Sequence, residues 1–268
     1  RPVTNDDIGL KVLREPPADT PEEVAKIIDI VAIHGIGAHP DDIWCKNIGT
    51  NENDARPVNW LRDPQMLPSV VPNTRILRYG YDVQWCGYSA IRQSVNTVAD
   101  RFLLALGRGR KDFPSRPLIL IAHCLGGLVV LKALVEAHRD PGEWLGIFNS
   151  VKGLLFFGTP FRGAEGISQS EILEAAWREH SKDQVQDQVL QVLQPGNELL
   201  QDLVDQFGKI RGSLKKAQIA CFYELKRSNI GQIVARETAT VGPLLLRIHT
   251  RRLIFHLDIH SQREFWLS

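Results

Sequence analysis

The chain has 268 residues, enough for one large α/β domain with a full hydrophobic core. Hydrophobic residues make up 43% and charged residues 24%, as in an ordinary globular protein, and a net charge of +1 provides no overall field that would attract nucleic acid. The four cysteines show no CxxC pairing and no run of 18 apolar residues occurs, so zinc sites, disulfide frameworks and membrane-spanning helices are not expected.

The first residues of the sequence are polar, so we do not expect them to be a secretory signal. The widely spaced cysteines favour reduced thiols, and we expect an intracellular, cytoplasmic protein. Residues 1–26 are predicted to form an amino-terminal edge element or connector, with a short strand at 9–14 before a proline-rich stretch. Residues 58–71 are expected to form a short irregular helix.

Apolar strands alternate with helical segments along most of the chain. Helical spacing of apolar residues is clear over 91–106 and 125–138. Apolar runs predict a buried strand at 27–33 and further strands at 75–79, 118–122, 151–157 and 218–222. This alternation predicts an α/β fold, a mostly parallel sheet with helices on both faces.

The second half of the chain contains one helical insert and one segment that is hard to interpret. Residues 161–215 are rich in leucine and valine, and we expect them to form a helical cap over an apolar pocket, although ordinary packing on the sheet would leave the same pattern. Residues 235–268 form a divergent tail without a clear pattern. We treat residues 1–268 as a single domain.

The most informative segment is the strand-to-helix junction at 119–127. The apolar strand ends in Ala-His-Cys-Leu-Gly-Gly, and an apolar helix follows. Small residues around a central nucleophile are typical of a nucleophile elbow, a tight corner that raises one reactive side chain above the sheet. Here Cys124 occupies the position where serine is usual, and Ala122 occupies that of the first glycine.

Two interpretations of Cys124 stay open. A thiol at the start of a helix is favoured as thiolate by the backbone dipole, and thiolate is a good attacker of carbonyl carbon. In the other interpretation the elbow has lost its serine and the thiol is inert. A catalytic cysteine would favour acyl transfer and thioester chemistry over fast ester hydrolysis.

Other catalytic groups are expected at the carboxyl ends of the strands. The loop His34-Gly-Ile-Gly37 would supply one oxyanion-hole N–H, from Ile36 or Gly37, and Leu125 the second; His34 itself would brace the loop. Glu224 would be the acid, with Glu165 as a second choice. His260 is favoured as the base over His249 and His256, none of which has a distinctive signature.

These segments resemble the α/β-hydrolase domains of the serine-active-site-containing protein family and of its fungal relatives. The matching segments are 29–38, 79–82, 122–127, 153–163 and 222–224. The resemblance implies a lipase- or esterase-like fold, and association with or fusion to NOD-like-receptor (NACHT) domains in fungi. It departs at Ala122 and Cys124, and residues 235–268 reproduce poorly the histidine turn that carries the family's base.

The sequence therefore predicts a lipase- or esterase-like hydrolase or acyltransferase that works through an acyl-enzyme on the elbow cysteine. Its substrate would be a small acyl or lipid ester, and no cofactor, metal or nucleic acid is implied. Basic clusters at 108–111 and 247–252 leave peripheral membrane contact open. The alternative is a catalytically degenerate module that serves in signalling or protein interaction.

Overall fold

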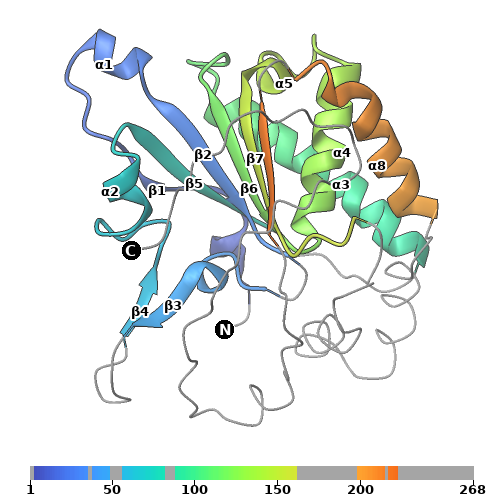
Figure 1. Cartoon of the computed structure of the whole chain (residues 1–268), viewed down its shortest axis with the longest axis horizontal. Helices are drawn as coiled ribbons and strands as arrows, with labels where there is room; N and C mark the ends of the chain where they lie inside the picture. Colours follow the sequence, from blue (N-terminus) through green and yellow to red (C-terminus); the bar gives the residue numbers. More distant parts are fainter. Residues whose placement is uncertain are drawn as a thin grey trace.

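A six-stranded sheet forms the centre of the molecule, and five of its strands are parallel (Figure 1). The computed structural model describes residues 3–35, 38–48, 56–81, 88–161, 198–214 and 217–222. The strand order is β1-β5-β2-β6-β7-β8, and only the edge strand β1 is antiparallel to its neighbour. The strands are β1 (Gly9–Arg14), β2 (Ile28–Ile33), β5 (Thr74–Gly80), β6 (Leu118–His123), β7 (Val151–Phe157) and β8 (Gln218–Phe222).

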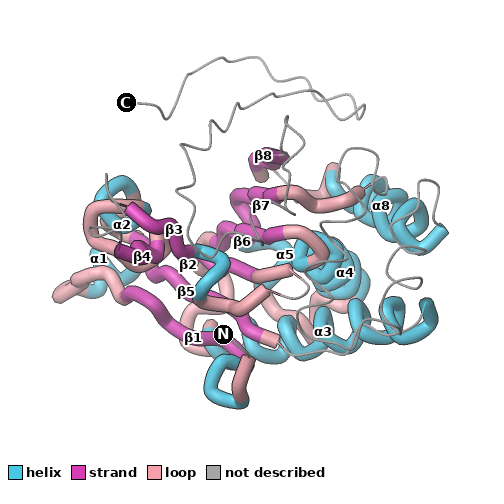
Figure 2. The backbone as a smooth tube through the Cα atoms, turned by 90° about the horizontal axis from the view of Figure 1, so that it is seen from below, coloured by secondary structure: helices cyan, strands magenta, loops and turns pink. Residues whose placement is uncertain are grey.

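Helices and a hairpin cover the two faces of this sheet. The described α-helices are α1 (Pro21–Ala25), α2 (Leu67–Val70), α3 (Tyr88–Gly109), α4 (Gly126–Arg139), α5 (Ile147–Ser150) and α8 (Glu198–Arg211). Figure 2 shows α3, α4 and α8 on one side of the sheet, and α2 with the hairpin β3 (Cys45–Ile48) and β4 (Arg56–Asn59) on the other. Two 3-10 turns, η1 (Asn5–Asp7) and η2 (Asp42–Trp44), precede β1 and β3.

The apolar residues of strand β2 contribute side chains to the cores on both faces of the sheet. Val31 and Ile33 join the large core under α3, α4 and α8, whereas Ile30 and Ala32 join the smaller core that contains Trp44. Successive side chains of a strand point to opposite faces, so a central parallel strand must be apolar at nearly every position. The predicted parallel sheet and its five strands are thus confirmed, although no residue of the edge strand β8 is fully buried.

The prediction of a helix over 58–71 was wrong for most of that range. Residues up to Asn59 belong to β4, which pairs antiparallel with β3, and only Leu67–Val70 are helical. Proline fixes φ and lacks an N–H, so Pro64 interrupts any continuous helix, while Pro68 is tolerated in the first turn of α2. Pairing of β4 with β3 depends on a separate segment of the chain, so the local pattern of apolar residues over 58–71 does not indicate it.

Part of the predicted insert packs on the body of the protein. Helix α8 lies against α4, and Leu200, Leu203 and Phe207 are buried in the large core. The rest of the insert, residues 162–197, and the tail from 223 onward lie outside the described residues. In the described parts of the chain, no helix combines the length and the apolarity needed to cross a bilayer.

Candidate active site

The junction between β6 and α4 is a strained corner centred on Cys124. The backbone φ of Cys124 is 49°, in the left-handed region that residues other than glycine rarely adopt. Its N–H donates to the carbonyl of Phe157 at 2.8 Å, which ties the corner to the neighbouring strand β7. Leu125 then leads directly into α4. The predicted strand–turn–helix elbow is confirmed.

Two glycines allow the turn after β2 to approach the elbow closely. A Cβ atom on Gly35 would lie 2.6 Å from the Cβ of Cys124, and one on Gly126 would lie 2.3 Å from the carbonyl oxygen of His34. Neither approach leaves room for a methyl group. The turn after β2 therefore passes against the elbow, as expected for two turns at the carboxyl ends of adjacent parallel strands. Ala122, where the resembling family has glycine, is fully buried and accommodated in the core.

Cys124 is partly exposed and packs against the margin of the large core. The nearby phenol of Tyr81 is buried; burial first, and then the charge of Cys124, raise the pKa of Tyr81 well above its ordinary value. By contrast, burial raises the pKa of Cys221, in β8, to about 11. Cys124 and Cys221 are both partly exposed and both pack against the large core, so the feature that distinguishes Cys124 is its place at the β6–α4 corner.

His34 braces the loop and does not carry a mobile proton. Its Nε2 accepts a hydrogen bond from the Tyr81 N–H at 3.1 Å, so its ring proton is on Nδ1, which donates to the Gly35 carbonyl at 2.8 Å. The Tyr81 hydroxyl donates to the His34 carbonyl at 2.9 Å. Burial lowers the pKa of His34 to about 4, so the ring is neutral near pH 7. The interpretation of His34 as a structural residue is supported.

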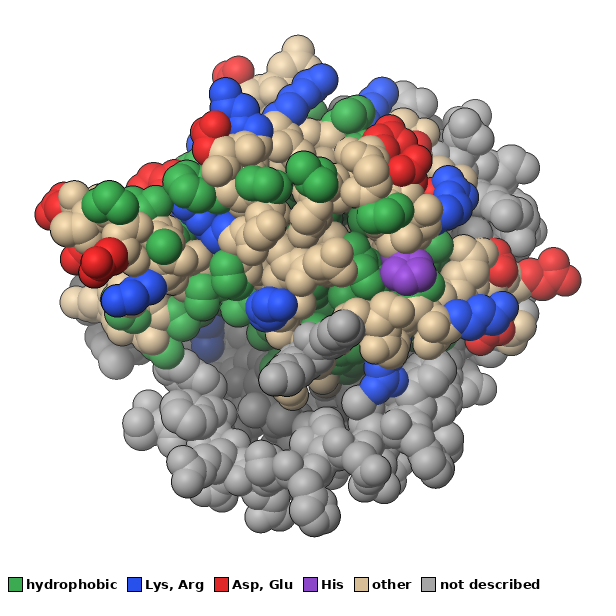
Figure 3. Space-filling model, turned by 90° about the horizontal axis from the view of Figure 1, so that it is seen from above, with side chains coloured by type: hydrophobic (Ala, Val, Ile, Leu, Met, Phe, Trp, Pro, Cys, Tyr) green, Lys and Arg blue, Asp and Glu red, His purple; other side chains and the backbone are tan. Residues whose placement is uncertain are grey.

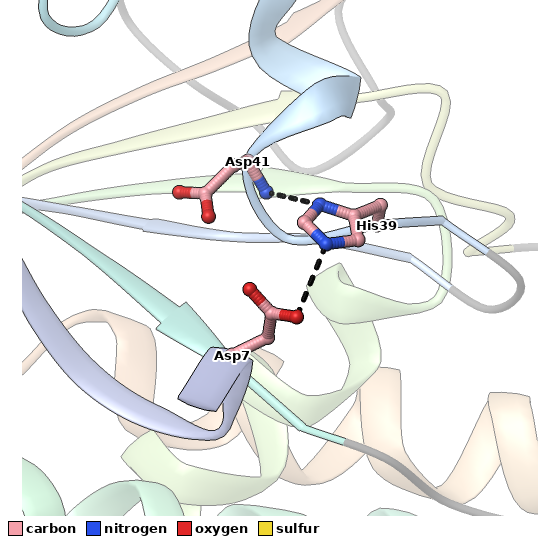
Figure 4. A group of neighbouring side chains, drawn as sticks. All are labelled: Asp7, His39 and Asp41. Atoms are coloured by element: carbon pink, nitrogen blue, oxygen red, sulfur yellow. Dashed lines mark hydrogen bonds and ion pairs between the residues drawn. The ribbon is translucent and has the colours of Figure 1, made fainter. Parts of the chain in front are cut away.

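A second group fixes the far end of the same loop (Figure 4). His39 Nδ1 accepts hydrogen bonds from the N–H groups of Asp41 and Asp42, at 3.1 and 3.3 Å. The ring proton therefore lies on Nε2, 3.3 Å from the carboxylate of Asp7. The buried guanidinium of Arg78 holds the carboxylate of Asp41 through Nε at 3.0 Å.

Asp7, His39 and Asp41 are close enough together to be considered as metal ligands, but their hydrogen bonds do not fit that role. A metal at Nε2 would need the ring proton on Nδ1, where two backbone donors already point. Arg78 also places a positive charge beside the group. The group instead joins η1, the loop after β2 and β5. Sequence reasoning missed it because its members are far apart in the chain.

Two of the predicted site residues, Cys124 and Leu125, lie together at the elbow. Leu125 is the N-cap residue of α4, at the helix end where backbone N–H groups have no acceptor in a preceding turn. The remaining predicted residues lie outside the described parts of the chain: Ile36, Gly37, Glu224 and the histidines 249, 256 and 260, as does the second-choice acid Glu165. Strand β8 ends at Phe222, whose carbonyl accepts from the Gly158 N–H, so it ends at the same edge of the sheet as β6 and β7.

No protein-family model matches the chain. Among curated proteins, it is 30% identical to protein SERAC1 of Danio rerio over 128 residues, which are 46% of this chain and 18% of that protein. It is 28% identical to protein SERAC1 of Mus musculus over 148 residues, 51% of this chain and 22% of that protein. The matched region is thus about a fifth of the length of these relatives.

Among solved structures, the chain is similar to phospholipase PlaB from Legionella pneumophila. The TM-score is 0.50 at 14% sequence identity, over 74% of this chain and 39% of that chain. At this level of identity the likeness concerns the fold. With the parallel sheet, the β6–α4 elbow and the helices on both faces, it shows that the chain adopts the α/β-hydrolase fold.

Proposed function

We propose that this chain is a carboxylic-ester or thioester hydrolase, or an acyltransferase, that forms an acyl-enzyme on Cys124. One observation carries the proposal: a partly exposed cysteine has a left-handed backbone conformation at a strand-to-helix corner, against a glycine of the neighbouring loop. Strained conformations of this kind cluster at active sites, because the surrounding fold must compensate their cost. Here the strain lifts a nucleophilic atom to the edge of the sheet.

The reaction would proceed by nucleophilic substitution at the acyl carbon. The Cys124 thiolate attacks the carbonyl carbon, and its electron pair forms the C–S bond while the carbonyl π electrons move to oxygen. The N–H of Leu125 and one from Ile36 or Gly37 would donate to this oxyanion. When the oxyanion collapses, the alkoxide or thiolate of the substrate leaves and takes the proton that a base histidine received from the thiol.

The acyl-enzyme would then be resolved by water or by another nucleophile. The same histidine removes a proton from the incoming molecule, which attacks the thioester carbon and expels the Cys124 thiolate. We assign the base to His260 and its acid partner to Glu224, following the chain order of this fold. Because a thioester is more reactive toward amines and thiols than an ester, a cysteine nucleophile favours transfer to such acceptors over simple hydrolysis.

The substrate class in this proposal is a lipid or other apolar acyl ester. The phospholipase PlaB shares the fold, and the leucine- and valine-rich residues 161–215 would provide apolar surface for an acyl chain. A cytoplasmic location, peripheral membrane contact, a fungal source and association with NOD-like-receptor domains stay predictions from the sequence.

The proposal is tested with a thiol-alkylating probe and acyl substrates. The protein is incubated with iodoacetamide and, separately, with a short-chain p-nitrophenyl ester and an acyl thioester. We expect the probe to label Cys124 faster than Cys45, whose pKa is raised by burial and nearby acids, and to label Cys221 slowly. Turnover should disappear in Cys124→Ala and in the alkylated protein.

Two variants separate the alternatives. Cys45→Ala is the matched control, because it removes an exposed thiol away from the elbow and should leave turnover unchanged. Cys124→Ser should retain measurable ester hydrolysis if the base and oxyanion donors are in place. A Cys124 thiol no more reactive than Cys221, with no turnover in the wild type or in Cys124→Ser, would contradict the proposal and favour a non-catalytic binding module.

A further inference from the structure

The amino-terminal end of the sheet, opposite the elbow, contains a buried cluster of charges. Asp29, at the start of β2, is fully buried and accepts hydrogen bonds from three arginines. The Nε and Nη2 of Arg75 bind its two carboxylate oxygens at 2.8 and 3.0 Å. Arg110 and Arg116 each donate through Nη1 to one of the same oxygens.

This cluster has more buried positive than negative charge. Three guanidinium groups face one carboxylate, and the side chains of Arg110 and Arg116 are only 2% and 6% exposed. Taking a charge out of water is costly unless an opposite charge compensates it. Burial lowers the pKa of Arg110 despite the opposing effect of Asp29, and the charges of Arg75 and Arg116 act in the same direction as burial. A further anion would relieve this imbalance.

A cavity of about 290 Å³ lies beside the cluster and is lined by all three arginines. Phe113 also lines it, and the guanidinium of Arg116 sits 4.2 Å from the centre of the Phe113 ring. The Nε of Arg110 is buried and has no hydrogen-bond partner among the described residues, although its Nη2 donates to three oxygens. A buried N–H donor without an acceptor is rare in native proteins, and here it adds to the uncompensated positive charge of the cluster.

Two acidic residues, Glu15 and Asp112, stand at the rim of the cavity. Both are exposed, so water and salt weaken their effect on the interior, whereas the arginines act from a less polar environment. Figure 3 looks down onto this end of the molecule and shows basic and acidic side chains interspersed over its surface. The described residues on this face gather no broad basic patch for a membrane, so recognition of an anion would come from the cavity.

We propose that this cavity is a binding site for a phosphate group, free or carried by a small soluble phosphomonoester. Guanidinium groups bind phosphate oxygens with paired, charge-assisted hydrogen bonds. The volume is near the lower limit of small-molecule sites, which suits a compact anion. The site is remote from Cys124, so its occupancy does not depend on the acyl chemistry.

The test is calorimetric titration of the intact protein with inorganic phosphate and with glycerol phosphate, at constant ionic strength in chloride buffer. Arg75→Gln removes the most exposed of the three guanidiniums and should weaken binding by about tenfold or more. Asp112→Asn removes a rim charge, is exposed and should fold normally; it should tighten binding about two- to fivefold. Arg139→Gln, an exposed arginine on α4, is the control and should leave the affinity unchanged.

A third arm separates a soluble ligand from a lipid headgroup. Co-sedimentation with vesicles containing phosphatidic acid should show no binding that Arg75→Gln removes. The proposal is overturned if neither soluble phosphate gives saturable heat, if Arg75→Gln and Arg139→Gln bind alike, or if only the vesicles bind. An unchanged affinity in Asp112→Asn would equally contradict binding in this cavity, and that variant keeps the test decisive should Arg75→Gln fail to fold.

Discussion

Tyr81 holds His34 by three contacts. The two rings stack with their centroids 4.2 Å apart, the Tyr81 N–H donates to His34 Nε2, and the Tyr81 hydroxyl donates to the His34 carbonyl. Ring and backbone of His34 are thus fixed together at the point where the chain leaves β2 toward Ile36 and Gly37. Because Gly35 touches Cys124, this pair also determines how the loop meets the elbow.

The pair makes stability depend on pH in a defined window. The pKa of His34 is about 4 in the folded state, mainly because of burial, against an ordinary value of 6.5. The unfolded chain therefore takes up the proton first, and the stability that neutral His34 contributes is complete above pH 6.5 and lost as the pH falls to about 4. A shift of this size corresponds to about 3 kcal/mol. Urea unfolding at pH 7, 5.5 and 4 measures it.

The control for this experiment is another histidine. His138→Gln, at an exposed position on α4, is measured at the same three pH values as the substitution control. His34→Asn should lower stability at pH 7 and flatten the slope between pH 6.5 and 4. The charges of His123, Arg78 and His39 also act on His34, in the same direction as burial. An equal slope in wild type and His34→Asn would show that other groups cause the pH dependence.

The left-handed backbone at Cys124 predicts opposite effects on stability and activity. This conformation costs a non-glycine residue about 1–2 kcal/mol, and glycine avoids it at the expense of more freedom in the unfolded chain. Cys124→Gly should therefore raise the free energy of unfolding by about 0.5–1 kcal/mol while abolishing turnover. Cys124→Ala should abolish turnover without this gain. A Gly variant no more stable than the Ala variant, by urea unfolding, would mean that the corner is unstrained.

Local patterns in the sequence were enough to predict the sheet and the elbow. The strand at 118–122, the small residues at 126 and 127 and the apolar helix after them are contiguous, so periodicity and residue size specify the corner. The tight contact of Gly35 with Cys124 follows from the order of the parallel strands, since β2 and β6 are neighbours.

Features that join distant segments could not be predicted in this way. The hairpin of β3 and β4, the Asp7–His39 pair and the three arginines around Asp29 each depend on the path of the chain in space. Asp29 did carry a signal, because a carboxylate inside a buried apolar strand requires a partner. Its partners lie 46, 81 and 87 residues away, and no local rule identifies them.

Gly35→Ala should damage the site by steric conflict alone. The new methyl would be 2.6 Å from the Cβ of Cys124 and 3.1 Å from the carbonyl oxygen of His123, neither of which is the end of a flexible side chain. We expect a loss of about 1–3 kcal/mol in the free energy of unfolding and a marked fall in any turnover. Gly107→Ala, in α3 with open space around it, should instead stabilise by about 0.5–1 kcal/mol. Equal effects of the two substitutions on thermal unfolding would disprove the contact.

The packing of α4 on the chain after β7 depends on Gly127 and Thr159. A Cβ on Gly127 would lie 2.2 Å from the Oγ1 and 2.4 Å from the Cγ2 of Thr159. Gly127→Ala should therefore destabilise by about 1–3 kcal/mol, because overpacking forces the helix or the loop to shift. Thr159→Ala removes the two nearest conflicting atoms and leaves only the Thr159 Cβ at 2.9 Å, so the double variant should be more stable than the sum of the single effects predicts, by about 1 kcal/mol.

Thr159→Val distinguishes shape from polarity in the same cycle. The Oγ1 of Thr159 is buried without a hydrogen-bond partner among the described residues, so replacing it with a methyl group should be neutral or stabilising by about 1 kcal/mol. Valine keeps the shape of threonine, however, and should not rescue Gly127→Ala. Urea unfolding of the six proteins, the wild type included, measures both effects. Rescue by valine as well as by alanine would show that the hydroxyl, and not the volume of the side chain, opposes a methyl group at position 127.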